Sequence, residues 1–263
     1  MDFGGHCARR LEMPDRGWTR LARRIAAIGL VAAAMGDATA ALAGASMQIA
    51  PILVDLEAPA AASTIDLTNQ ALQPASIQVR VFAWTQADGK EGLTPTNDVV
   101  ASPPFATIAS GAKLSIRVIR ATQRPVKAEE AYRVVIDQLP EATGNGKAIV
   151  SMLLRQVLPV FFAAANRTPP EIAWSIQKTD KGYALFAHNS GDRRLRIVNA
   201  ILILPDHRSI KMSSGLLGYV LGHSDMSWAI PGRAQGLVPG ASATIHADGD
   251  MGVIVAKALV TRR

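Results

Sequence analysis

The side chains that could do acid–base or metal chemistry lie in the second half of the chain. They are four histidines without the regular spacing of metal ligands on one element: His188, His207, His223 and His246. Two of them could meet after folding and bind a metal. The alternative, which we favour, is that each is solvated or hydrogen-bonded.

One tripeptide, His223-Ser224-Asp225, contains the three residue types of a catalytic triad. Adjacent residues of an extended segment point in opposite directions, so they seldom form one. The sequence also lacks a Gly-rich phosphate loop, a metalloprotease helix motif and a nucleophile elbow. We therefore expect no catalytic residue, no cofactor and no metal, and hence a protein that is not an enzyme.

Two arginines interrupt strand-like patterns. Arg80 stands between apolar residues beside Phe82 and Trp84, as an exposed strand arginine does when its stem rests on aromatic rings. Arg155 interrupts an apolar run, and a buried guanidinium needs a carboxylate or several acceptors. That carboxylate could be an Asp or Glu of the same chain, or one from outside it.

The run that contains Arg155, residues 148–162, predicts a long strand that is apolar on both faces. Residues on one side are Val150, Met152, Leu154, Leu158, Val160 and Phe162, and on the other are Ile149, Leu153, Val157 and Phe161. A strand with one face in water alternates between apolar and polar residues. This strand must therefore be sandwiched, or lend one face to something outside its own domain.

Residues 1–45 have the composition of a secretory signal peptide. Six arginines and an apolar run that is too short to span a membrane precede small residues, with cleavage expected after Ala43 or Ala45. A poor twin-arginine match favours ordinary export, and an uncleaved membrane anchor is the alternative. We predict a periplasmic protein that is not an integral membrane protein. The only cysteine, Cys7, leaves with this segment, so no disulfide is expected.

The remaining chain carries 22 basic and 17 acidic residues, a net charge of +5, without a dense Lys/Arg cluster. A mild surplus of this kind argues against nucleic acid as a partner.

Short alternating segments separated by Gly, Pro and Asn predict an all-β protein built from β-sandwiches. We expect strands at residues 47–56, 63–68, 76–84, 114–118 and 132–136, a turn at Asp88-Gly89, and a second series at 172–177, 183–188, 195–204, 243–247 and 252–260. Residues 166–170 read as a linker. A weak echo between 108–116 and 237–245, each with Gly-Ala in a turn, suggests two similar sandwiches in tandem. We place the domains at residues 46–163 and 164–263.

The first of these domains resembles the periplasmic pilus chaperones of the chaperone–usher pathway, which are PapD-like, and particularly their archaic or alternative branch. The resemblance covers most of residues 46–163 and rests on several motifs: Val79-Arg80-Val81-Phe82-Ala83-Trp84, Ser102-Pro103-Pro104, Gly111-Ala112-Lys113 before Ile116-Arg117-Val118, Glu130-Ala131-Tyr132-Arg133, Leu139-Pro140, and Leu154-Arg155 to Pro159-Val160-Phe161. It implies two immunoglobulin-like sandwiches set at an angle.

The resemblance also implies a function, which is to bind pilus subunits, stabilise them by donating a β-strand, and deliver them to an outer-membrane usher. Residues 148–162 occupy the donor position, so Val150, Met152 and Leu154 would enter the subunit groove. Family members hold the subunit's terminal carboxylate with two basic residues in the cleft between domains. The usual positions fall at Leu53 and near Val157, so Arg80 and Arg155 are nominated instead.

The resemblance further suggests an interdomain role for Glu130 and Asp250. Because a bare apolar edge is an aggregation hazard, the free protein is expected to shield its donor strand, for instance by self-association. Two rival functions remain. One is another exported sandwich, such as a pilus subunit or a carbohydrate-binding module, and the other is a periplasmic enzyme that uses the scattered histidines.

Overall fold

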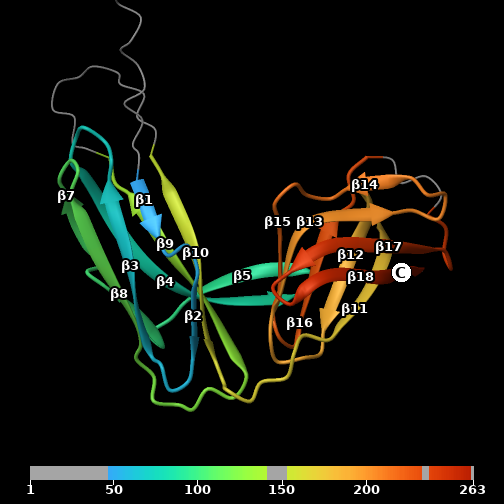
Figure 1. Ribbon diagram of the computed structural model, residues 1–263, viewed down its shortest axis with the longest axis horizontal. Coiled ribbons are helices and arrows are strands. Elements are labelled where there is room, and N and C mark those ends of the chain that lie inside the picture. Colours follow the sequence, from blue (N-terminus) through green and yellow to red (C-terminus); the bar gives the residue numbers. More distant parts are fainter. Residues whose placement is uncertain (1–46, 141–152, 233–236, 262–263) are drawn as a thin grey trace, which may run out of the picture. The chain divides into compact units, whose positions relative to one another are not determined.

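The computed structural model describes residues 47–140, 153–232 and 237–261, and every regular element in these ranges is a β-strand. The strands build two sandwiches, so the all-β prediction is confirmed (Figure 1). Within the described residues there is no helix long and apolar enough to cross a membrane.

The first sandwich consists of two sheets. One has the order β1-β3-β8-β6, and the other has the order β2-β10-β9-β4-β5 with β7 paired to β4. Their bounds are β1 Met47–Ala50, β2 Val54–Glu57, β3 Ala62–Asn69, β4 Ala75–Ala87, β5 Lys90–Pro95, β6 Val99–Ser102, β7 Phe105–Ile108, β8 Lys113–Arg120, β9 Glu129–Gln138 and β10 Arg155–Ala163.

The second sandwich is built from one curled series of strands in the order β14-β13-β17-β18-β11-β12-β16, with β15 paired to β13. Their bounds are β11 Ile172–Thr179, β12 Gly182–Asn189, β13 Leu195–Ile203, β14 Ser209–Lys211, β15 Leu216–Val220, β16 Ser224–Ala229, β17 Ser242–Gly249 and β18 Gly252–Thr261.

Alternation decides which side chains fill each core. In β4, Ile77 and Val79 point into the first sandwich, where they meet Ile116 and Val118 of β8 across the core. The second core is also built mainly from Ile, Leu, Val and Ala, as the low aromatic content predicts. Burial of such side chains supplies most of the folding free energy in a domain of this size.

The predicted strands are present, but the chain start is divided. The segment expected as one strand forms β1, which pairs with β3, and β2, which pairs with β10 in the other sheet. Sequence periodicity missed the short strands β5, β6, β7, β14, β15 and β16, because these are too short or too polar to alternate. The predicted turn at Asp88-Gly89 is confirmed, since both residues have positive φ between β4 and β5.

The internal repeat lies elsewhere than the sequence echo suggested. The two Gly-Ala turns precede β8 and β17, but these two strands are not equivalent. Strand β8 pairs with β3. Strand β17 pairs with β13 and β18, in the same way as β9 of the first sandwich pairs with β4 and β10. The matching feature is instead a buried asparagine that ends β3 and β12, namely Asn69 and Asn189. The echo is therefore not a structural repeat, because its two halves occupy different topological positions.

Candidate functional site

Strand β10 is paired along its whole length on one side and along less than half of it on the other. All its residues pair with β9, but only Val160, Phe161, Phe162 and Ala163 pair with β2. In the described part of the chain, the opposite edge of Arg155 to Pro159 has no partner strand. Such an edge exposes backbone N–H and C=O groups that can pair with another chain.

The two apolar faces of β10 now have separate explanations. Leu158, Val160 and Phe162 point into the core of the first sandwich. On the other face, Phe161 packs with Trp84 and with Tyr219 of the second sandwich, at ring centroid distances of 5.8 and 5.9 Å. The outer face is therefore covered by the second sandwich at one end only. Further along, the side chain of Val157 stays 44% exposed.

Arg80 and Arg155 lie together at the uncovered end of this outer face. The Arg80 guanidinium donates to Asp137 at 2.6 Å, and Arg155 donates to the other oxygen of the same carboxylate. Burial alone would raise the pKa of Asp137, but the hydrogen bonds from Arg155 and Arg80 hold it below its usual value. The partner of Arg155 is thus an internal aspartate, one of the two interpretations that the sequence allowed.

The position of this pair differs from the cleft in which it was expected. Arg155 pairs across the sheet with Asp137, whereas the last residue of β10, Ala163, pairs with Glu129 beside the second sandwich. Eight residues of strand span about 26 Å. Arg155 therefore lies at the end of β10 that is distant from the contacts between the sandwiches, whereas Arg80 lies in the middle of β4, four residues before Trp84.

A different arginine lies nearer to those contacts. Arg133 of β9 pairs across the sheet with Pro159, and its guanidinium carbon is 3.5 Å from the ring centroid of Trp84 and 5.9 Å from that of Tyr219. The side chain is only 14% exposed, and its one ion pair with a described residue, Glu91, is 3.6 Å long. It makes no hydrogen bond to any residue that the structure describes. Burial lowers the pKa of Arg133, and the charge of Glu91 partly offsets this.

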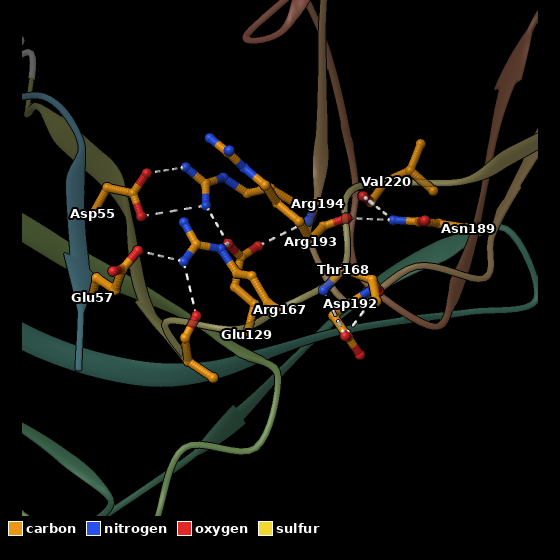
Figure 2. A network of polar contacts seen from close by, with 11 residues as sticks. Asp55, Glu57, Glu129, Arg167, Thr168, Asn189, Asp192, Arg193, Arg194 and Val220 are labelled. Atoms are coloured by element: carbon orange, nitrogen blue, oxygen red, sulfur yellow. Dashed lines mark hydrogen bonds and ion pairs between the residues drawn. The ribbon is translucent and has the colours of Figure 1, made fainter. Parts of the chain in front are cut away.

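The two sandwiches are joined by an ionic network, shown in Figure 2. Arg194 of the second sandwich donates to Glu129 at 2.6 Å and to Asp55 at 2.7 Å, and its guanidinium carbon lies 3.7 Å from the ring centroid of Phe161. Arg167 of the linker donates to Glu57 at 2.8 Å. Burial alone would lower the pKa of Arg194, but the two carboxylates raise it above its usual value.

Glu130 and Asp250, for which an interdomain role is predicted, make their side-chain hydrogen bonds within their own sandwiches. Glu130 accepts two hydrogen bonds from Arg120, at 2.8 Å each, within the first sandwich. Successive residues of a strand face opposite sides, so the neighbouring Glu129 faces Arg194 instead. Asp250 pairs with Arg196 of its own sandwich at 3.2 Å.

The histidines do not form a common site. His188 pairs with Asp225 at 2.7 Å, and His223 pairs with Asp192 at 2.8 Å, so the triad-like tripeptide is divided between two partners. No group of three or more His, Cys, Asp or Glu side chains that could hold a metal occurs among the described residues.

Sequence reasoning missed Arg133, Glu129 and Arg194 because each looked like an ordinary polar residue of an alternating strand or turn. For Arg133 a signal was available. Arg133 stands between Tyr132 and Val134, which point into the core, and so it lies on the opposite face of the sheet, which also carries Phe161. Of the three residues predicted to enter the subunit groove, Leu154 is half-buried directly before β10. Val150 and Met152 lie outside the described residues.

Comparison with known proteins interprets this geometry. Residues 46–166 match the family described as pili and flagellar-assembly chaperone, PapD N-terminal domain. The first sandwich is therefore similar to the N-terminal domain of PapD-like pilus chaperones. No curated protein matches the chain.

Several solved structures share the fold. A chain of the CsuC–CsuE chaperone–tip adhesion subunit pre-assembly complex, from archaic Csu pili of Acinetobacter baumannii, is 24% identical, with 83% of this chain and 100% of that chain covered and a TM-score of 0.62. The complex of the Salmonella enterica SafB chaperone with the SafA pilin is 16% identical, with 80% of this chain and 96% of that chain covered and a TM-score of 0.54. The E. coli chaperone DraB is 13% identical, with 81% of this chain and 96% of that chain covered and a TM-score of 0.54. At these identities the likeness concerns the PapD-like two-sandwich fold.

Proposed function

We propose that this protein is a PapD-like chaperone, which binds a pilus subunit by donating the free edge of β10, together with the segment before it, to an incomplete subunit sheet. The observation that carries the proposal is the edge of β10 from Arg155 to Pro159, which has no partner strand among the described residues, whereas the other edge of β10 pairs with β9 along its whole length. Backbone hydrogen bonds along such an edge provide affinity, and alternate side chains provide specificity.

The side chains that fill the subunit groove are Val150, Met152 and Leu154 in this proposal. Leu154 supports it, because this half-buried residue leads into β10 and its carbonyl accepts a hydrogen bond from the N–H of Gln138 at 2.9 Å. The backbone of Leu154 is thus already aligned with β9, so the edge that a subunit would meet extends from β10 to Leu154.

The terminal carboxylate of the subunit has two candidate sites. Arg80 and Arg155 already share the carboxylate of Asp137, so an external carboxylate must compete with it. Arg133 has no hydrogen-bonded acceptor among the described residues, and it lies across from Pro159 at the end of the free edge. A buried guanidinium without an acceptor gains most from a carboxylate that it can bind in a bidentate manner. We therefore favour Arg133, with Arg80 and Arg155 as the alternative anchor.

The experiment is co-expression with the pilin genes that neighbour the chaperone gene, followed by recovery of the complex from the periplasm. We expect a one-to-one complex that Met152→Asp weakens strongly, because a carboxylate would enter an apolar groove. Arg133→Ala should weaken it more than Arg155→Ala. The reverse order would assign the anchor to Arg155. Absence of any bound pilin, with normally folded chaperone, would overturn the proposal.

Export to the periplasm, delivery to an outer-membrane usher and self-association of the free protein complete the proposal. Self-association follows from the free β10 edge, since exposed edges pair readily with other chains. Light scattering of the purified protein checks this point. A strict monomer whose β10 edge is cleaved freely by protease would contradict it.

A further inference from the structure

The backbone of Tyr219 and Leu221 is held from the first sandwich by one side chain. Gln86, the penultimate residue of β4, donates from its amide nitrogen to the carbonyl of Tyr219 at 2.9 Å. Its amide oxygen accepts the N–H of Leu221, also at 2.9 Å. A glutamine amide carries the same donor and acceptor as a peptide group, so Gln86 pairs with this segment as a neighbouring strand would.

This contact is buried and uncharged. Gln86 is 6% exposed, and neither of its two hydrogen bonds involves an ionised group. It therefore differs from the Arg194 network, which joins the same two sandwiches through ion pairs. Buried hydrogen bonds of this type matter most when one partner is removed, because the other is then left unsatisfied.

The segment that Gln86 holds forms one wall of the Arg133 site. The Tyr219 ring meets Trp84 edge-on at a centroid distance of 5.5 Å, and Leu221 belongs to the same apolar cluster. Arg133 stacks on Trp84 and faces Tyr219 at 5.9 Å. If the Tyr219 backbone moves away, this wall is lost and water can reach the guanidinium. A hydrated guanidinium binds a carboxylate less tightly than a desolvated one.

We propose that Gln86 is a positioning residue for subunit binding, because it keeps Tyr219 and Leu221 of the second sandwich against Trp84 and thereby maintains the desolvated surroundings of Arg133. This inference rests on the proposed function, in which Arg133 receives the carboxylate of the subunit. Gln86 itself does not touch the subunit and acts through Tyr219.

The test is a double-mutant cycle on the full-length chaperone co-expressed with its neighbouring pilin, with the pilin-to-chaperone ratio recovered from periplasm as the readout. Gln86→Ala should reduce this ratio about tenfold, as expected for loss of a buried bidentate contact. In an Arg133→Ala background the same change should have almost no further effect. Gln86→Glu keeps the shape but loses the donor, so it should behave like Gln86→Ala.

Gln177→Ala is the matched control. It changes a half-buried glutamine of β11 whose side chain makes no hydrogen bond to any described residue, and it should leave the ratio unchanged. A merely structural role for Gln86 predicts equal losses in both backgrounds, and that result would overturn the inference while the proposed function stands. A wild-type chaperone that recovers no pilin would overturn both.

A second readout needs no subunit. Urea unfolding of the wild type should show one transition by intrinsic fluorescence and by far-UV circular dichroism, because the sandwiches are coupled. Gln86→Ala should separate the two curves, whereas Gln177→Ala should not. Coincident curves for Gln86→Ala would overturn the inference, because they would show that the sandwiches stay coupled, and Tyr219 stays in place, without Gln86.

Discussion

Asn69 and Asn189 end equivalent strands of the two sandwiches, and both are buried. Each side-chain nitrogen donates to the carbonyl four residues later and to two carbonyls of a distant turn, and each oxygen accepts the N–H two residues later. The partners are Gln73, Ile108, Ala109 and Ala71 for Asn69, and Arg193, Val220, Leu221 and Gly191 for Asn189. The oxygen of Asn189 accepts one further bond, from the N–H of Glu171 after the linker.

We call each buried asparagine with its hydrogen-bonded turns a hub. The hubs of Asn69 and Asn189 make the same bonds to their turns but have different neighbouring residues. Three residues after the asparagine, the first sandwich has Leu72, which is 80% exposed, and the second has Asp192, which binds the linker residue Thr168. Five residues after it, the first has Pro74 and the second has Arg194, which reaches Glu129 and Asp55. The contacts of this turn with the linker and with the first sandwich therefore come from the residues that flank the hub, Asp192 and Arg194, and the bonds of the asparagine to its turns are the same in both sandwiches.

The largest effect is expected from removing the hubs. Asn189→Ala leaves three carbonyls and two N–H groups without their side-chain partner, so we expect a loss of about 3 to 5 kcal/mol in the free energy of unfolding. Asn69→Ala should cost about 2 to 4 kcal/mol. Urea unfolding measures both.

Only Asn189→Ala should also loosen the joint between the sandwiches, seen as faster proteolysis within residues 166–170. Equal linker cleavage in the two variants would show that the hubs do not differ in this respect.

The next effect concerns Arg194, whose side chain is 1% exposed. Arg194→Ala leaves the buried Glu129 with only the longer ion pair to Arg167, at 3.9 Å, so we expect a loss of about 2 to 4 kcal/mol at neutral pH. Arg120→Ala, which breaks a pair inside the first sandwich, is the comparison and should cost about 1 to 3 kcal/mol. Thermal unfolding of both variants gives the order. A smaller loss for Arg194→Ala would contradict the role of this arginine as the main joint.

How much of this was predictable differs between the fold and the site. Alternation in segments such as residues 76–84 indicated the strands, because a buried face leaves a period of two in the sequence. The ion pairs between the sandwiches leave no such period in the sequence. Glu129 and Glu130 are adjacent glutamates, and only the register of β9 decides which one meets Arg194. The internal partner of Arg155 was open for the same reason, since strand pairing alone places Asp137 opposite it.

A pH-dependent effect is expected in the second sandwich. Hydrogen bonds from the N–H of Thr168, from His223 and from the Thr168 hydroxyl lower the pKa of Asp192 from 3.8 to about 2. Because the folded pKa is depressed, the stabilisation by Asp192 is complete above pH 3.8 and is lost as the pH falls through about 2.

Asp192→Leu, which copies Leu72, should remove this dependence. An NMR titration of the Thr168 amide between pH 5 and pH 2, at about one-unit steps, is the measurement. An unchanged titration in the variant would exclude Asp192 as its cause.

The smallest effect concerns the turns that the asparagines bind. Two residues after the carbonyls of Ala109 and Leu221 lie Gly111 and His223, with φ of 71° and 53°. A non-glycine residue is disfavoured in this region, so His223→Gly relieves strain but loses the bond to Asp192. We expect a net change within about 1 kcal/mol, against a loss of about 1 kcal/mol for Gly111→Ala. A large destabilisation by His223→Gly would show that its side chain dominates.

The central claim is that the β10 edge becomes paired when a subunit binds. Hydrogen exchange of the backbone amides of β10 that point away from β9, with and without bound pilin, tests it most directly. We predict that these amides between Arg155 and Leu158 exchange much more slowly in the complex, while amides of β18 keep their rates. Unchanged exchange at the β10 edge in a stable complex would contradict strand donation.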